Sequence, residues 1–260
     1  MLLPILLVVA ARDLFLPVVG RIRDPLHDIR TSVTLRNTTN AEAHATVRFV
    51  PTAGTIATTK SVDVVLPPNA TRTVDPFGDE RGLGALHITS DQPLLANGRI
   101  GTPPSSASFD ALSPKDAISS GEAAKLDGFT FTHAATETNR LYVVETEGDA
   151  LQYTVIVLGP GGRVLAQNLH FIHPFEQHSI DLDRVFPMLA SPKASVLLRG
   201  LNGNGSIVAA AAITKRSNGE IDAREMTVTL RKNRGLSRTE KLAYAALALF
   251  IIGAAIRRRR

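Results

Sequence analysis

One short stretch of the chain gathers three histidines with neighbouring carboxylates. His170, His173 and His178 fall within nine residues, and Asp181 and Asp183 follow. Imidazole and carboxylate groups are ligands of Zn²⁺ and also serve as general acids and bases. In an extended strand, however, His170 and His173 point to opposite faces because their spacing is odd. We therefore interpret the stretch as a turn with solvated side chains and predict no metal and no cofactor. The five residues are the candidate ligands if a metal does bind.

Acidic residues also gather at Asp79-Glu80, at 145–149 and at 181–183. Carboxylates in neighbouring loops of exported β-proteins can hold Ca²⁺. The spacing here matches no EF-hand loop, in which ligands recur at alternate positions. Solvated turns are the interpretation that we prefer, and Ca²⁺ binding is the alternative.

The sequence lacks the motifs of common catalytic sites. There is no cysteine, which excludes thiolate chemistry and disulfides. No Gly-x-Ser-x-Gly elbow occurs, and the Gly-rich segments 159–162 and 200–205 lack the Gly-Lys-Ser/Thr ending of a phosphate loop and are predicted to be hairpin turns. Trp is absent, so aromatic platforms for sugars are scarce. We predict that the chain is not an enzyme; a β-sandwich hydrolase is the least favoured alternative.

Short strands separated by turn residues make up the body of the chain. Segments 31–36, 45–50 and 61–66 contain the alternating polar and apolar residues of half-buried strands. Ser90-Asp-Gln-Pro93 has the composition of a turn, which predicts a hairpin between strands at 84–89 and 94–100. No long helix is evident, so the pattern indicates an all-β fold of antiparallel sheets.

The order of strands and turns occurs twice along the chain. Four pairs of segments align in order: 33–49 with 141–157, 65–75 with 171–181, 85–88 with 195–198, and 94–100 with 207–213. Such self-similarity indicates a tandem duplication. We place the two units at 12–113 and 114–230, each with the length of an antiparallel β-sandwich of about a hundred residues.

Four motifs of the body, all strand ends or turns, have counterparts in a known class of protein. They are Leu14-Phe-Leu-Pro17, Thr34-Leu-Arg-Asn37, Leu66-Pro-Pro-Asn-Ala70 and Thr89-Ser-Asp-Gln-Pro-Leu-Leu95. Through them the chain resembles the tandem immunoglobulin-like β-sandwich repeat proteins of bacterial cell surfaces. The resemblance implies two tandem immunoglobulin-like sandwiches with a role in surface architecture or adhesion, and no catalytic residues. The Cys…Trp…Cys signature of antibody domains is missing.

The first eleven residues have no charged side chain. They end in Val9-Ala-Ala11, which fits the small-residue rule of a signal-peptide cleavage site. The segment before the apolar run lacks a basic side chain, and a buried N-terminal strand is the alternative. We predict a signal peptide at 1–11 and export of the body.

A second apolar run, 242–256, is followed by four arginines. A helix of this length spans about 22 Å against a bilayer core of about 30 Å, but flanking Lys241 and Arg257 can snorkel to the interface. Because a helix without a polar face is either deeply buried or in lipid, we predict a transmembrane helix at 242–256. A basic linker at 231–241 precedes it, and a cytoplasmic tail at 257–260 follows it. The residues that mark the anchor are Leu242, Tyr244, Phe250, Ile256, Arg257, Arg258, Arg259 and Arg260.

The basic character of the chain comes from this tail. Nine of the 29 Lys and Arg residues lie from Arg231 onward beside one acidic residue, so the body holds more acidic than basic residues. A basic face for nucleic acid is therefore not expected, and we predict no nucleic-acid partner.

These features predict a single-pass protein of the cell membrane with its body extracytoplasmic, in the periplasm or on the cell surface, and its C-terminus cytoplasmic. The expected role is a structural or adhesive module that presents its two units to a protein, a surface polymer or a second copy of itself. The alternative is an accessory binding subunit of a membrane-embedded complex, with the tail helix packed against other helices.

Overall fold

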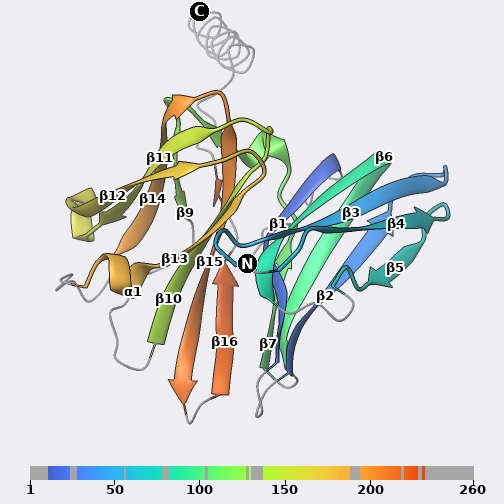
Figure 1. Ribbon diagram of the computed structural model, residues 1–260, viewed down its shortest axis with the longest axis horizontal. Helices are drawn as coiled ribbons and strands as arrows, with labels where there is room; N and C mark the ends of the chain where they lie inside the picture. Colours follow the sequence, from blue (N-terminus) through green and yellow to red (C-terminus); the bar gives the residue numbers. More distant parts are fainter. Residues whose placement is uncertain are drawn as a thin grey trace, which may run out of the picture.

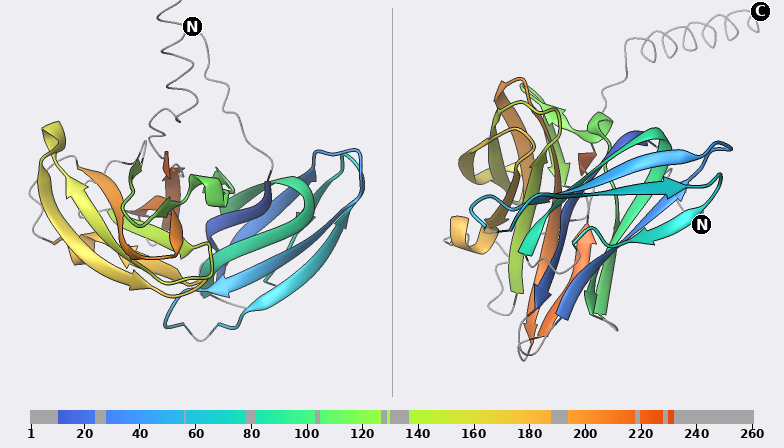
Figure 2. Two further views of the ribbon diagram at one scale, coloured as in Figure 1. Left: turned by 90° about the horizontal axis from the view of Figure 1, so that it is seen from above. Right: turned by 45° about the vertical axis from the view of Figure 1, so that its right-hand side comes forward.

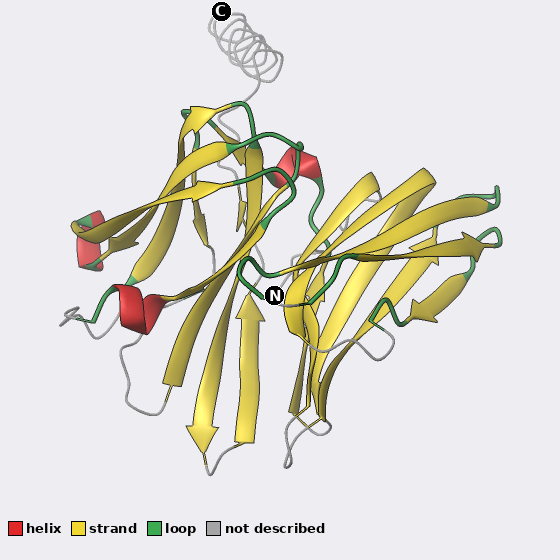
Figure 3. Ribbon diagram, viewed as in Figure 1, coloured by secondary structure: helices red, strands yellow, loops and turns green. Residues whose placement is uncertain are grey.

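A computed structural model of the chain describes residues 11–23, 28–55, 57–77, 82–102, 105–126, 129, 137–187, 194–217, 220–227 and 230–231. Within these residues strands dominate, and helix is confined to one short α-helix and two 3₁₀ turns (Figure 3). The predicted all-β class is confirmed. The predicted signal peptide at 1–11 lies outside the described residues except for Ala11, the first residue of β1, and the predicted transmembrane helix at 242–256 lies outside them entirely. None of the described helices is long and apolar enough to cross a membrane.

The elements of the first unit are β1 (Ala11–Arg23), β2 (Asp28–Asn37), β3 (Ala43–Pro51), β4 (Lys60–Leu66), β5 (Thr71–Val74), β6 (Gly82–Thr102) and β7 (Ser105–Asp110). Those that follow are η1 (Pro114–Asp116), β8 (Ile118–Ser119), β9 (Ala123–Leu126), β10 (Glu137–Glu145), β11 (Leu151–Leu158), η2 (Pro160–Gly162), β12 (Val164–Ile172), β13 (Gln177–Asp181), α1 (Leu182–Val185), β14 (Ser195–Gly203), β15 (Ser206–Ser217), β16 (Glu220–Thr227) and β17 (Leu230–Arg231).

Seven strands of the first unit form one antiparallel sheet, here called sheet A. Its order is β4-β3-β6-β1-β2-β5, and β7 also pairs with β6. Because β1, β2 and β6 each pair with the other two, the sheet closes on itself around a core. Along β3, alternation points Ala45, Val47 and Phe49 into that core, as its polar–apolar pattern predicts.

Strand β6 runs without interruption through the predicted hairpin turn at Ser90–Pro93. Its first half pairs with β1 and β3, and its second half with β2 and β7. Polar side chains satisfy the backbone where the strand changes partners, since Asp91 Oδ1 accepts a hydrogen bond from the backbone N–H of His44 at 2.8 Å. The hairpin prediction is wrong because the local composition is that of a turn, whereas the two halves of the strand find partners elsewhere.

The second unit holds two sheets that face each other. Sheet B has the order β13-β10-β15-β16, with β8 on β15, and sheet C has the order β12-β11-β14-β9-β17. Leu141 and Val143 of sheet B share one buried core with Val155 and Leu198 of sheet C. This unit is therefore a two-layer antiparallel sandwich.

The two units have the same strand order. Strands β4-β3-β6-β1 correspond to β12-β11-β14-β9, and strands β5-β2-β6-β7 correspond to β13-β10-β15-β16. The continuous strand β6 takes the places of both β14 and β15. In the second unit Asn204-Gly205 breaks the path into two strands. The predicted turn at 204–205 is thus present, but it joins strands of different sheets and closes no hairpin. The shared order agrees with a duplication, whose predicted boundaries stay a prediction.

Strand β10 and residues 206–212 of β15, in the middle of sheet B, carry buried side chains on both faces because the first unit covers the outer side of the sheet (Figures 1 and 2). Tyr142, Ala210 and Ala212 belong to the core of the first unit, and Phe15 and Ala85 of the first unit belong to the core of the second. The small alanine side chains of β15 let the two layers approach closely. The two units therefore pack as one body.

Candidate functional site

The histidine stretch of the sequence lies at the edge of the second unit where β12 and β13 face each other. His170 is on β12, His178 is on β13, and their ring centroids are 6.4 Å apart. His173 lies in the exposed turn between the strands and contacts the ring of Phe171. The predicted turn with solvated histidines is therefore correct for His173 alone, because His170 and His178 lie on strands and are partly buried.

A buried tyrosine joins this edge to the core. The hydroxyl of Tyr153, on β11, lies 3.0 Å from Nδ1 of His178, and Nε2 of His178 lies 3.2 Å from Oε2 of Glu176. Burial raises the pKa of Tyr153, and the Glu176 carboxylate raises it further. The hydroxyl therefore stays protonated and donates to His178, which in turn donates to Glu176. Since Tyr153 of sheet C is fully buried and His178 belongs to sheet B, this set of hydrogen bonds ties the two sheets together.

His170 completes the edge from the other strand. Its ring stacks on Tyr153 with centroids 5.2 Å apart, and its Nε2 is buried without a hydrogen-bond partner among the described residues. Burial lowers the pKa of His170, and the nearby His178 lowers it further. The imidazole is therefore neutral at neutral pH, and the edge carries no positive charge from it.

The two aspartates of the predicted ligand set have structural partners. Asp181 caps α1 by accepting a hydrogen bond from the backbone N–H of Arg184 at 3.1 Å. Asp183 accepts hydrogen bonds from the backbone and the side-chain amide of Asn139, at 2.7 and 3.1 Å. They do not converge with the histidines, and the part of the chain that the structure describes contains no group of three metal-ligating side chains.

Glu145 differs from the solvated turn residue that the sequence predicts. Its carboxylate is fully buried and accepts hydrogen bonds from four backbone N–H groups. They belong to Glu147, Gly148, Phe175 and Ser206, at 2.7, 2.8, 2.9 and 3.3 Å. A carboxylate so satisfied is a fixed part of the fold and has no oxygen left for a cation. The prediction failed because two of the donors, Phe175 and Ser206, are distant in the sequence and only the tertiary structure brings them to Glu145.

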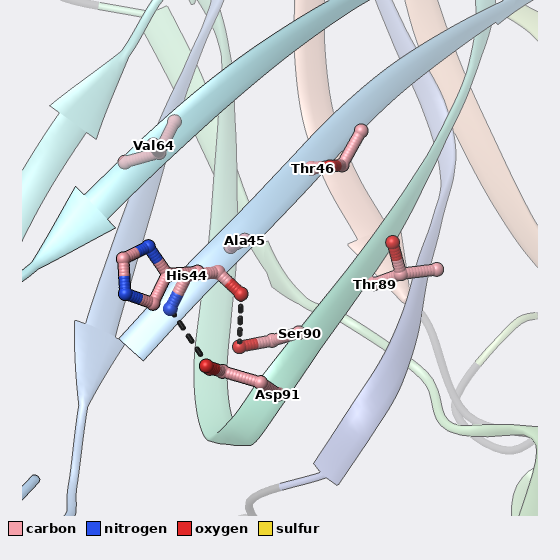
Figure 4. Close-up of a pocket in the computed structure, with 7 residues that line it drawn as sticks. All are labelled: His44, Ala45, Thr46, Val64, Thr89, Ser90 and Asp91. Atoms are coloured by element: carbon pink, nitrogen blue, oxygen red, sulfur yellow. Dashed lines mark hydrogen bonds between the residues drawn. The ribbon is translucent and has the colours of Figure 1, made fainter. Parts of the chain in front are cut away.

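A hollow of about 240 Å³ lies over β3, β4 and β6 in the first unit (Figure 4). Its polar rim is made by His44, Ser90 and Asp91, which bond to one another. Asp91 accepts from the backbone N–H of His44, and the hydroxyl of Ser90 donates to the carbonyl oxygen of His44 at 3.2 Å. These groups fix β6 to β3 at the place where β6 changes partners. The hollow is open to solvent.

The outer side of β12 exposes more large apolar side chains than any other described strand. Val164, Leu169 and Phe171 are exposed by 55%, 55% and 53%. Among the described strands, β12 pairs only with β11, so its second backbone edge is free. It lies on the side of the second unit away from the first (Figure 1). Sequence reasoning missed this surface, although the run 164–172 contains no Lys, Arg, Asp or Glu.

Comparison with known proteins gives no family. No family model matches the chain, and no curated protein matches it. One similar solved structure is described as the crystal structure of Thermotoga maritima 1070, with 13% identity over 40% of this chain and 94% of that one. Its TM-score of 0.33 is too low to carry an argument about fold or function.

Proposed function

We propose that the chain is a non-catalytic module, anchored in the membrane and extracytoplasmic, that binds a protein or polymer surface through the free edge of β12. The observation that carries the proposal is that this edge is long, contains no Lys, Arg, Asp or Glu, and exposes Val164, Leu169 and Phe171. Natural edge strands usually carry charge, Pro or a bulge that prevents pairing with another chain. Strand β12 pairs irregularly with β11 at Leu165, but from Ala166 to Ile172 its pairing is regular and it carries neither charge nor Pro, which suits strand addition.

The membrane anchor and the export signal are part of the proposal. Their support is the apolar run 242–256 with Arg257–Arg260 after it, and the uncharged run 1–11. A tether of this kind suits a module whose binding edge is on the folded body.

The proposal includes immunoglobulin-like sandwiches as the finer description of the fold. Its support is that β10 pairs with β13 and β11 with β14, as the second and third strands of immunoglobulin domains pair with the fifth and sixth. One feature departs from that pattern. Strands β14 and β15 lie in different sheets, whereas the last two strands of a constant-type domain share one.

The topology is tested on intact cells that produce the full chain with an epitope tag after Arg260. Added trypsin should digest the body and leave a tagged fragment protected inside. If trypsin is given access to the periplasm as well as the cell surface, a body that stays intact or a tag that is removed contradicts the proposed orientation.

The binding edge is tested by attachment of producing cells to cells that lack the chain. The double substitution Leu169→Lys and Phe171→Lys should reduce attachment to that of non-producing cells. The matched control is Val62→Lys with Val65→Lys on β4, the other edge strand with exposed valines, which should leave attachment unchanged. If the β12 substitutions leave attachment unchanged, the proposed binding edge is wrong.

A further inference from the structure

The free edge of β12 is unusual among the outer strands of this protein. The outer strands β4, β5, β13 and β16 each carry at least one Lys, Arg, Asp or Glu, whereas β12 carries none over nine residues. Charged side chains at an edge repel a second strand, and their absence leaves the edge open to pairing.

We infer that two copies of this chain associate through antiparallel pairing of their β12 strands, so that sheet C continues from one copy into the other. This inference rests on the proposed function, because it names a second copy of the chain as a partner of the same edge. Self-pairing of one strand about a two-fold axis gives a closed dimer, since both copies use the same surface.

The side chains of β12 fit a two-fold axis at Leu169. Residues on successive positions of a strand face opposite sides, so Gln167, Leu169 and Phe171 share the outer face. With the axis at Leu169, the two Leu169 side chains lie opposite each other and each Phe171 lies opposite the Gln167 of the other copy. Exposed apolar side chains thus meet at the centre, where directly opposed cross-strand pairs stabilise a sheet.

The inner face of the same strand gives a polar match. His170 and Asn168 point to this side, because they alternate with the outer residues. In the proposed register, His170 of one copy lies opposite Asn168 of the other. The partly buried His170 side chain of each copy is thereby placed opposite a side-chain amide of the other copy.

Charge complementarity favours a second copy in the antiparallel direction. Exposed Arg163 precedes β12 at one end. The acidic turn with exposed Glu147 and Asp149 lies at the other end, because Leu151 pairs with Ile172. An antiparallel pair brings the basic end of each strand to the acidic end of its mate, at two symmetric places. Parallel pairing would bring like charges together.

The absence of cysteine makes a direct test possible with the full chain in detergent. Directly opposed residues of antiparallel strands have Cα atoms about 4.5–5.5 Å apart, within the range that a disulfide spans. Under mild oxidation, Leu169→Cys should therefore form a disulfide-linked dimer that a reductant dissolves. Val65→Cys, also an exposed apolar residue on an edge strand, is the matched control and should stay monomeric.

The register is tested by mixing two single variants. Gln167→Cys with Phe171→Cys should give a mixed dimer in higher yield than either variant alone. Light scattering should also give the mass of two chains for the unmodified protein and of one chain for Phe171→Lys, with unchanged circular dichroism. A monomeric unmodified chain, or equal crosslinking at Leu169 and Val65, overturns the dimer.

The two proposals fail in different ways. If the chain is monomeric but attachment to cells that lack it still depends on Leu169 and Phe171, the dimer is wrong and the binding edge stands. If the chain is monomeric and attachment ignores the β12 substitutions, both proposals are wrong.

Discussion

The imidazole ring of His87 stacks on the phenyl ring of Phe175, with centroids 5.5 Å apart and planes inclined by 19°. His87 belongs to β6 of the first unit, and Phe175 to the turn between β12 and β13 of the second. On its other side, His87 stacks on Phe15 at 4.4 Å, and the guanidinium of Arg48 lies 6.0 Å from the Phe175 ring. This row of side chains holds the turn at the end of β12 against the first unit.

Removal of one ring from this row should weaken the contact between the units. Phe175→Ala is expected to lower the free energy of unfolding by about 1–2 kcal/mol, because the stack and the cation–π contact are both lost. Urea denaturation of the full chain at low protein concentration measures the change. Phe171→Ala is the control, since that ring is more than half exposed, and should cost less than about 0.5 kcal/mol. Equal losses of the free energy of unfolding in the two variants would show that this row of side chains does not stabilise the contact between the units.

The buried carboxylate of Glu145 should be essential for the local fold. Glu145→Gln replaces one acceptor oxygen by an NH₂ group, which then faces backbone N–H groups that have no acceptor. We expect a loss of about 2–4 kcal/mol, measured by urea denaturation, because charge-assisted hydrogen bonds disappear and buried donors stay unpaired.

Glu147→Gln is the control for this substitution. Its side chain is exposed in the same turn, and the change should stay within about 0.5 kcal/mol. A loss at position 145 as small as that at position 147 would contradict the role of the four backbone donors.

Acid should weaken the second unit through His170. Burial lowers the pKa of His170 in the folded chain below the value of about 6.5 in the unfolded chain. The unfolded state therefore binds more protons between these two values. The stabilisation that comes from keeping His170 neutral in the folded chain is complete above about pH 6.5. It is lost as the pH falls through the pKa of His170 in the folded chain.

The measurement is the free energy of unfolding between about pH 7 and pH 5, a range that covers the ordinary histidine pKa. His170→Phe keeps a ring on Tyr153 but cannot take up a proton, so its stability should fall less steeply than that of the unmodified chain. Burial also lowers the pKa of His87, so part of the dependence of stability on pH remains in both proteins. Phe171→Ala changes an exposed side chain that does not titrate and should leave the steepness unchanged; the same flattening in both variants would rule out a specific effect of His170.

The strands of the body could be predicted where one face is buried and the other is solvated. The alternation around Val47 and Val64 is such a case, because the period of two is a local property. The turn at Asn69, with φ of 57°, also follows from local composition, since Asn tolerates this backbone region.

The remaining features depend on contacts between distant residues. The path of β6 through Pro93 is set by strands on both sides, and no local signal separates it from a turn. The burial of Glu145 needs donors as far away as Ser206. The free edge of β12 could have been noticed from its lack of charge, but its position at the border of sheet C comes only from the topology.

The alanines of β15 are the contact surface between the units, which leads to a last prediction. Ala210 is fully buried and belongs to the core of the first unit, although it lies on a strand of the second. Ala210→Leu inserts three carbon atoms between two close-packed layers, so the layers must separate or the side chain must leave its preferred rotamer. We expect a loss of about 1–3 kcal/mol in urea denaturation. Ala123→Leu, at an exposed position of β9, should be neutral within about 0.5 kcal/mol. A stable Ala210→Leu variant would show that a space remains between the units, contrary to the close packing of Ala210 in the core of the first unit.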